Sequence, residues 1–345
     1  MLEKPAIQDE TITECLRGTY GIEIQQITFL PLGADRNTAV YRAVSDAEIP
    51  YFVKLRRGEF DETSVAIPDI LSKQGNKYII APLSTHSGQL WAELSGFHLI
   101  LYPFIEGQGG FDIDLSDDDW MIFGQALKGV HSATIPPAIA SHIHREDYSP
   151  YWREIVQRFQ QQIETEIFTE PVAAKLITFL RGKQHVVSYL VSRAEQLGAV
   201  LKSQPEAFVL CHSDIHAGNI LIDNHNALYI VDWDQPIFAP KERDLMFVGG
   251  GLGGNGHTAE QEETLFYAGY GQTQINTVAL AYYRYERIVQ DIAAYCDQLL
   301  TTDEGGADRE QGLHQLMSQF LPDQVIDLAY RTEKKLPVEF QFKLT

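Results

Sequence analysis

The chain of 345 residues is 44% hydrophobic, has a net charge of −20 and contains three cysteines. This length allows about two domains, and so large a negative charge argues against nucleic acid as a partner. The sequence has no run of about 18 apolar residues to span a membrane, and the widely spaced Cys15, Cys211 and Cys296 fit neither a disulfide framework nor a zinc motif. Because residues 1–5 lack signal-peptide character, we expect a cytoplasmic protein that does not bind membranes. We also expect a monomer.

The first hundred residues have the pattern of a small sheet domain. Segments rich in β-branched and aromatic residues alternate with turn residues, which predicts strands. The predicted strands are 24–31, 38–44, 50–55, 78–83 and 97–103. Residues 61–75 have helical periodicity, although Pro68 is expected to bend or split that helix. We therefore assign residues 1–105 to one domain, a sheet with at least one helix.

Long helices dominate the chain after the glycine-rich residues 107–110, which we interpret as the hinge between two lobes. Ser116 precedes three aspartates, a typical helix N-cap with acids in the first turn. Apolar residues then recur at helical spacing, which predicts helices at 116–130, 152–163, 172–202, 258–270, 276–300 and 310–330. Short strands are expected at 208–211, 220–222 and 228–231, the last two as a hairpin. Residues 106–345 thus form a second, mainly helical domain.

The acidic residues are unevenly distributed, because most of the acidic excess lies after residue 105. A solvated surface is the ordinary explanation. A cleft lined by one sign of charge would instead concentrate a cationic substrate. The composition leaves both interpretations open.

The strongest chemical signal is an Asp-x-x-x-x-Asn motif between predicted strands. Asp214 and Asn219 form this motif, and Asp232 ends the second strand of the hairpin that follows. The hairpin would bring Asn219 and Asp232 to the same end, where amide and carboxylate oxygens suit Mg²⁺. Asp214 would then face an acceptor hydroxyl. This arrangement is typical of phosphoryl transfer from a metal-bound nucleotide.

The pattern resembles the catalytic and metal-binding loops of the aminoglycoside phosphotransferase and choline kinase family, where His-x-Asp-x-x-x-x-Asn is followed by Ile-x-Asp-Trp. Further similarity lies in residues 33–37, 102–105, 152–156 and 282–289. Over residues 212–250 the chain is most similar to the spectinomycin 9-phosphotransferase branch of that family. The resemblance implies an α+β, bilobal, protein-kinase-like fold with a small antiparallel-sheet N-lobe and a mainly helical C-lobe.

The resemblance also implies roles for individual residues. Asp214 matches the catalytic aspartate that orients the acceptor hydroxyl, and Asn219 and Asp232 match the ligands of Mg²⁺. Lys54 matches the lysine that contacts the phosphates of ATP. Glu62 is expected to be the helix glutamate that pairs with Lys54. Asp61 and Glu59 are the alternatives to Glu62.

Other nucleotide contacts are expected in the N-lobe. The phosphate-covering loop has only one glycine, Gly33, so backbone amides and Asn37 are expected at the phosphates. Adenine is expected against strand 99–105, with Pro103 and Ile105 as hinge contacts. Because Pro103 has no N–H, a neighbour such as Ile105 must donate the hydrogen bond.

We expect the acceptor to be a cationic aminocyclitol with two protonated methylamino groups, as in spectinomycin. Its candidate contacts are Asp234, Glu242, Glu286 and Trp233. For Glu242 and Glu286 a solvated or paired surface role is equally open. Asp291 stands four residues after Arg287, so an ordinary intrahelical ion pair is its favoured interpretation. Asp244 is expected to brace the catalytic loop.

The sequence therefore predicts an ATP- and Mg²⁺-dependent O-phosphotransferase that confers resistance to an antibiotic. A kinase for choline, methylthioribose or another amino-alcohol or sugar is an alternative, because the motif reflects the phosphate chemistry and not the acceptor. A catalytically inactive nucleotide-binding scaffold is the alternative from another class. The joint presence of Lys54, Asp214 and the two metal-ligand candidates argues against it.

Overall fold

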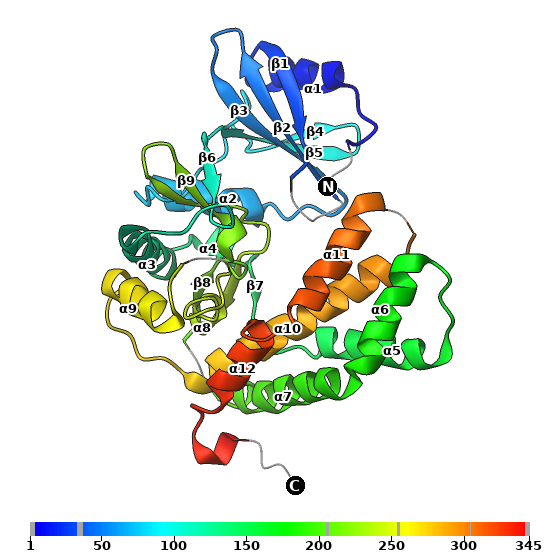
Figure 1. The fold of residues 1–345 in the computed structure, drawn as a ribbon. Helices are drawn as coiled ribbons and strands as arrows, with labels where there is room; N and C mark the ends of the chain where they lie inside the picture. The colour runs from blue at the N-terminus through cyan, green and yellow to red at the C-terminus, as the bar shows by residue number, and fades with distance from the viewer. Residues whose placement is uncertain (1–3, 33–36, 205–206, 254–255, 304, 342–345) are drawn as a thin grey trace.

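The computed structural model describes residues 4–32, 37–204, 207–253, 256–303 and 305–341 (Figure 1). Its N-terminal part is a five-stranded antiparallel sheet in the order β1-β2-β3-β5-β4. The strands are β1 (Ile24–Leu30), β2 (Thr38–Ser45), β3 (Pro50–Arg57), β4 (Ala92–Leu94) and β5 (Phe97–Pro103). Helix α1 (Asp9–Cys15) and the following turn η1 (Leu16–Tyr20) bury Ile12 and Leu16 in the same core as Val53 and Leu99. This packing keeps β3, which carries Lys54, rigid at the centre of the sheet.

The C-terminal part is mainly helical, with two small three-stranded sheets. One sheet contains β6 (Gly107–Gly109), β9 (Ile220–Asp223) and β10 (Leu228–Ile230), and the other β7 (His144–Arg145), β8 (Val209–Cys211) and β11 (Ile237–Ala239). The helices are α3 (Asp117–His131), α4 (Pro137–Ala140), α5 (Tyr151–Thr165), α6 (Pro171–Gly182), α7 (Gln184–Lys202), α8 (Glu242–Leu245), α9 (Ala259–Tyr270), α10 (Thr277–Leu300), α11 (Gly306–Ser318) and α12 (Val325–Glu333), with 3₁₀ turns η2 (Ala217–Asn219) and η3 (Val338–Phe340). No helix in the described ranges combines the length and apolarity that crossing a membrane requires.

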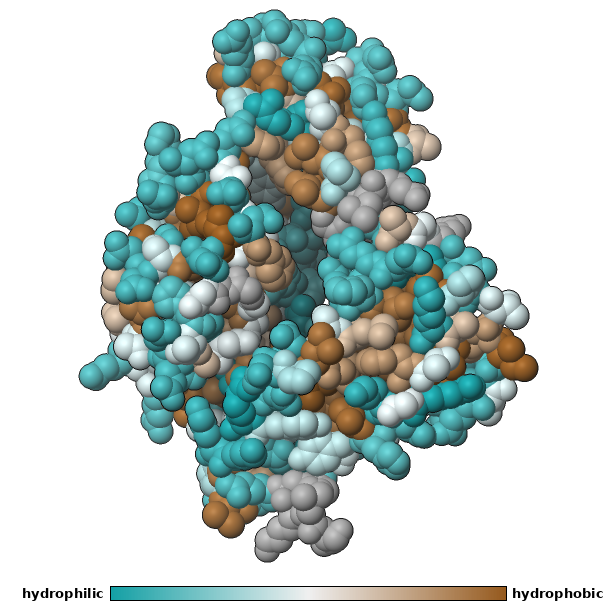
Figure 2. All heavy atoms as spheres, in the orientation of Figure 1, coloured by the Kyte–Doolittle hydropathy of each residue, from teal (hydrophilic) through white to brown (hydrophobic). Residues whose placement is uncertain are grey.

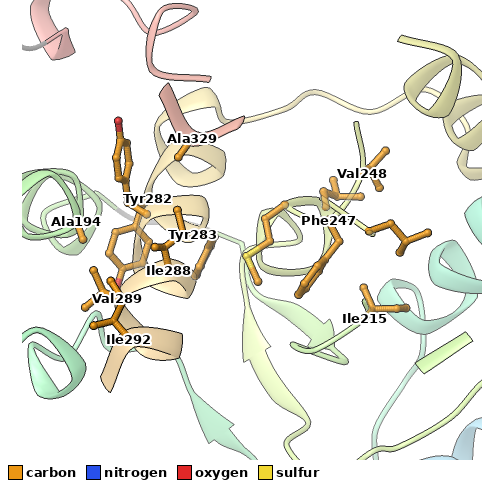
Figure 3. Packing of buried hydrophobic residues seen from close by; sticks show 14 of the residues in the cluster. Ala194, Ile215, Phe247, Val248, Tyr282, Tyr283, Ile288, Val289, Ile292 and Ala329 are labelled. Atoms are coloured by element: carbon orange, nitrogen blue, oxygen red, sulfur yellow. The ribbon is translucent and has the colours of Figure 1, made fainter. Parts of the chain in front are cut away.

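Helix α10 is the central element of the helical part. It contacts α5, α7, α11 and α12, and Figure 3 shows Tyr282, Ile288 and Ile292 of α10 among buried side chains that include Ala194 of α7 and Ala329 of α12. Full burial of one such isoleucine contributes about 1.5–3 kcal/mol to stability. The polar residues of α10 are therefore presented at positions fixed by this packing.

Helix α2 (Thr63–Lys73) packs on the C-terminal part although the sequence places it in the first domain. Ile67 and Leu71 are buried in the C-terminal core, and Asn76 Nδ2 donates to the Ala126 carbonyl at 3.4 Å. Pro68 lies inside a single helix, so the split is wrong, while the alternative, a bend, stays a prediction. Residues 63–79 thus attach the first lobe to the second.

Most predicted elements are present, with three differences. Residues 78–83 do not form a strand and contain only an isolated bridge between Ile79 and Ile230. The expected helices 172–202 and 310–330 are each two helices. The expected hinge at 107–110 begins as strand β6, which pairs with β9. The predicted boundary at residue 105 stays a prediction.

Candidate active site

The loop between β8 and β9 is held in place by the buried carboxylate of Asp244. Asp244 Oδ2 accepts a hydrogen bond from the His212 amide at 2.9 Å, and Oδ1 accepts one from the Ser213 amide at 2.6 Å. His131 Nε2 lies 3.0 Å from Oδ2. Burial alone would raise the pKa of Asp244, but these hydrogen bonds and the nearby histidines hold it below its usual range. The predicted bracing role of Asp244 is confirmed.

Asp214 lies in this loop, five residues before Asn219. Asn219 Nδ2 donates to the Asp214 carbonyl at 2.7 Å, so the five-residue spacing brings the two residues together. Arg287 Nη1 of α10 donates to Asp214 Oδ1 at 2.6 Å. Burial raises the pKa of the Asp214 carboxyl, but Arg287 and His216 outweigh burial and lower it. Asp214 therefore stays ionised near neutral pH and can accept a proton.

Asn219 and Asp232 lie at the same end of the hairpin, as predicted. The Val231 amide donates to the Asn219 carbonyl at 3.0 Å, which fixes the end of β10 beside the turn η2. Asp232 has a φ of 63° and a half-exposed side chain. Because Asn219 uses its amide nitrogen on Asp214, its amide oxygen remains an acceptor. An amide oxygen and a carboxylate form a donor set that fits Mg²⁺.

Lys54 is the buried cation of the site. Its Nζ lies 2.8 Å from Asp232 Oδ1 and 2.7 Å from Asp234 Oδ1. Arg56, two residues further along β3 and hence on the same face of the strand, pairs with the other oxygen of Asp234. Burial alone would lower the pKa of Lys54, but the two carboxylates raise it well above its usual value. Lys54 is thus charged and lies beside Asp232, one of the two metal-ligand candidates.

The predicted pair between Lys54 and Glu62 is wrong. Glu62 is exposed and stands at the N-terminal cap of α2, and the ion-pair partners of Lys54 are Asp232 and Asp234. The physical reason is that α2 is held on the C-terminal core, while carboxylates after β10 neutralise Lys54 instead. The alternative Asp61 accepts from the Thr63 amide at 2.8 Å and so serves the start of α2.

The other expected nucleotide contacts stay predictions. Gly33 lies outside the described residues. Asn37 is exposed directly before β2, and its carbonyl accepts from the Arg57 amide at 2.8 Å. Pro103 ends β5, so Ile105 lies beyond the strand ladder. The Ile105 amide at this position stays the predicted hinge donor.

Three of the four expected acceptor contacts are internal residues, so these expectations are wrong. Trp233 is 4% exposed and donates to the Ile230 carbonyl at 3.3 Å. Glu242 is 2% exposed and accepts from the Asn276 amide at 2.9 Å, with Lys241 also near. Glu286 is 5% exposed and accepts from Arg153 at 2.5 Å. Each of these side chains packs or pairs with other residues inside the helical part.

Asp234, the fourth expected acceptor contact, faces the first lobe. Both of its carboxylate oxygens are in ion pairs with cations of β3, Lys54 and Arg56. Asp234 is therefore better placed to orient Lys54 than to bind a substrate cation.

Sequence reasoning missed three residues of the site. Arg56 follows Lys54 by two, a spacing that could have identified it. Arg287 forms the expected pair with Asp291, with Nε 3.0 Å from Oδ1, but it also reaches Asp214. Phe111 is 59% exposed and stacks on His216, with ring centroids 5.6 Å apart. No sequence signal relates Arg287 or Phe111 to the motif, because only the tertiary fold brings them there.

The space-filling view shows a recess between the first lobe and the helical part (Figure 2). Its visible floor is mainly hydrophilic. In Figure 1 the loops around β8 and β9 lie on one side of the molecule, while α5, α6 and α11 lie on the other. The contact between Arg287 of α10 and Asp214 joins the helical part to the catalytic loop.

Comparison with known proteins agrees with this geometry. A model of the phosphotransferase enzyme family matches residues 28–235. Protein StrN of Streptomyces griseus is 21% identical over 308 residues, which are 87% of this chain and 88% of that protein.

Solved structures give the same relationship. A crystal structure of spectinomycin phosphotransferase, APH(9)-Ia, in complex with ADP and spectinomycin has a TM-score of 0.87 and 38% identity, and the match covers 96% of this chain and 100% of that chain. Choline kinase LicA from Streptococcus pneumoniae has a TM-score of 0.56 and 15% identity, with 90% and 97% covered, and so shares the fold. The predicted kinase-like fold is confirmed. The chain belongs to the phosphotransferase enzyme family and is a phosphotransferase that acts on alcohol groups.

Proposed function

We propose that this enzyme transfers the γ-phosphoryl group of ATP to a hydroxyl of spectinomycin or a closely related cationic aminocyclitol, with Mg²⁺, and thereby confers resistance. The observation that carries the proposal is the 38% identity to spectinomycin phosphotransferase over 96% of this chain. The choline kinase and the amicoumacin kinase hAmiN are only 15% and 14% identical and support no particular acceptor.

Different residues of this chain have different roles in the proposed reaction. Asp214 orients the acceptor hydroxyl and takes its proton, because its carboxylate is ionised and partly exposed. Lys54 contributes a buried positive charge on the phosphate side. Asn219 and Asp232 would hold Mg²⁺, which neutralises charge on the phosphates when bound. Catalysis of this kind depends mainly on positioning and on electrostatic stabilisation.

A cationic acceptor agrees with the charge around Asp214. Asp291 lies behind Arg287 and its carboxylate is partly exposed, so two carboxylates flank a single guanidinium. The net negative charge of this group attracts a protonated amine. The acidic excess of the C-terminal domain supports the same conclusion for the protein as a whole.

The test is an ATP- and Mg²⁺-dependent assay with spectinomycin, choline, methylthioribose and an aminoglycoside as parallel acceptors. We expect a phosphorylated product from spectinomycin, detected by mass spectrometry, and loss of about 10²–10⁴-fold in rate in Asp214→Ala. Turnover of choline without turnover of spectinomycin would overturn the substrate but not the reaction class. Wild-type rates in Asp214→Ala would overturn the catalytic role.

Resistance is tested in a susceptible bacterium that expresses either form of the enzyme. The wild-type enzyme is expected to raise the inhibitory concentration of spectinomycin, and Asp214→Ala at equal protein level is not. Equal protection by both forms would mean that phosphorylation is not the cause. A protein that binds ATP but phosphorylates none of the four acceptors would support the inactive scaffold.

A further inference from the structure

Four polar side chains form a continuous chain of contacts from the catalytic loop into the helical part. Arg287 Nη1 donates to Asp214 Oδ1 at 2.6 Å, and Arg287 Nε lies 3.0 Å from Asp291 Oδ1. Gln319, next to the end of α11, donates to Asp291 Oδ2 at 2.9 Å. The guanidinium of Arg287 thus connects two carboxylates from different parts of the fold.

The position of Arg287 is determined by more than the intrahelical pair. Its guanidinium carbon lies 5.7 Å from the ring centroid of buried Phe247, a cation–π distance. Its side chain is 24% exposed, whereas exposed helix pairs such as Lys73–Asp69 leave the cation 73% exposed. Because Nε and Nη1 bind different carboxylates, the planar guanidinium has little freedom to turn. Arg287 is therefore fixed before any substrate arrives.

The ion pair with Arg287 gives the two oxygens of the Asp214 carboxylate different surroundings. Oδ1 is occupied by Arg287. Nε2 of His216 lies 3.8 Å from Oδ2, beyond hydrogen-bond distance, and within the described residues Oδ2 has no hydrogen bond. One oxygen is thus anchored while the other remains free on a partly exposed side chain.

The charges explain why an arginine is tolerated beside a residue that must accept a proton. Arg287 alone would neutralise Asp214 and repel a cationic acceptor. Asp291 offsets the guanidinium, so that the three side chains together have a net charge of −1 when both carboxylates are ionised. Gln319 is neutral and holds Asp291 in its place.

We propose that Arg287 is a positioning residue for phosphoryl transfer, which holds Oδ1 of Asp214 so that Oδ2 faces the acceptor hydroxyl. As the acceptor oxygen bonds to the γ-phosphorus, its proton passes to Oδ2, and the bond from that phosphorus to the bridging oxygen of ADP breaks. Asp291 and Gln319 act indirectly, because they hold Arg287 in position. The inference rests on the phosphotransferase reaction and not on the identity of the acceptor.

The first test compares Arg287→Met with Arg287→Lys and with a matched control, Arg309→Met. Arg309 is a buried arginine that donates to Glu170 at 2.6 Å and, among the described residues, pairs with none in the catalytic loop. We expect Arg287→Met to lower kcat by about 10²-fold, the usual effect of a misplaced catalytic group, with an unchanged KM for ATP. Arg287→Lys should recover part of the rate, since it keeps the charge but loses the fork geometry.

The second test separates action through Asp214 from an independent role. Arg287→Met is introduced into Asp214→Asn, and the two effects are compared in a double-mutant cycle. If Arg287 acts by positioning Asp214, its removal causes no further loss of kcat in Asp214→Asn. An equal loss in both backgrounds, a wild-type kcat in Arg287→Met, or the same loss of kcat in Arg309→Met would overturn the proposal.

Spectinomycin and water serve as parallel acceptors in these assays. If no form of the enzyme phosphorylates spectinomycin, the proposed substrate is wrong. If the slow hydrolysis of ATP nevertheless falls in Arg287→Met, the positioning role is still supported. If Arg287→Met does not fold, as judged by circular dichroism, Asp291→Asn is used. It preserves shape and should lower kcat in the same direction, and unchanged kcat in Asp291→Asn would contradict the fixed guanidinium.

Discussion

Lys54 Nζ lies 2.8 Å from Asp232 Oδ1, although 178 residues separate them in the chain. The contact joins the central strand of the first lobe to the end of β10 in the second. It places a buried cation beside one of the two residues that fit a metal ion. The two halves of the proposed phosphate site are therefore in direct contact across the lobes.

Lys54→Met should impair nucleotide use more than folding. The substitution removes the cation that we propose faces the phosphates, and it leaves Asp232 and Asp234 in mutual repulsion. We expect a loss of about 10²-fold or more in kcat/KM for ATP, as for removal of a stabilising charge from a transition state. Steady-state kinetics at varied ATP concentrations measure this loss of kcat/KM. Lys73→Met, which removes an exposed lysine paired with Asp69, is the control and should match the wild type.

Asp244→Asn should disorder the catalytic loop. The buried carboxylate accepts from two loop amides and contacts His131. A neutral amide cannot accept as many hydrogen bonds, and each buried group left without a partner costs about 1–3 kcal/mol. We expect a lower melting temperature together with a lower kcat. A variant with the wild-type melting temperature and rate would show that the loop holds its shape without the charge.

The sequence was most informative where chemistry depends on short spacing. Asp214, Asn219 and Asp232 belong to one loop and one hairpin, so their proximity follows from local geometry. Strands β1, β2, β3 and β5 were also predictable from composition and turn residues. Lys54 was assigned correctly to β3 but with the wrong partner, because ion pairing depends on how the lobes pack.

The expected acceptor contacts failed for a related reason. Glu242, Glu286 and Trp233 have the right chemistry for a cationic substrate, but chemistry does not reveal burial. For Arg287 the sequence indicated one partner and missed another. Its local pair with Asp291 was predictable from the i,i+4 spacing, whereas its contact with Asp214 exists only because α10 packs beside the catalytic loop.

The helix cap at Glu170 should give a measurable pH dependence of stability. Its carboxylate accepts from the Val172 and Ala173 amides at 3.1 and 2.7 Å and pairs with Arg309. Desolvation opposes ionisation, but these bonds prevail and lower the pKa of Glu170 below its ordinary value of 4.5. Its stabilisation is therefore complete above pH 4.5 and is lost as the pH falls through the lowered value.

Glu170→Gln tests this cap. Loss of an N-cap commonly costs about 0.5–2 kcal/mol, so the variant should unfold at lower denaturant concentration near neutral pH. The difference from the wild type should shrink as the pH is lowered through the pKa of the folded state. A difference that stays constant across this range would mean that ionisation of Glu170 does not contribute.

Glu286→Ala distinguishes a structural glutamate from a substrate contact. The carboxylate is buried against Arg153, and burial raises its pKa although Arg153 opposes the rise. Removing one partner of a buried ion pair commonly costs about 3–5 kcal/mol, because the other charge is left unpaired. We expect a clear fall in the free energy of unfolding, measured by urea titration, with an unchanged KM for the acceptor in the folded fraction. A raised acceptor KM with wild-type stability would instead restore Glu286 to the substrate site.

The paired variant Arg153→Met with Glu286→Leu should regain much of the lost stability, because no buried charge then remains without a partner.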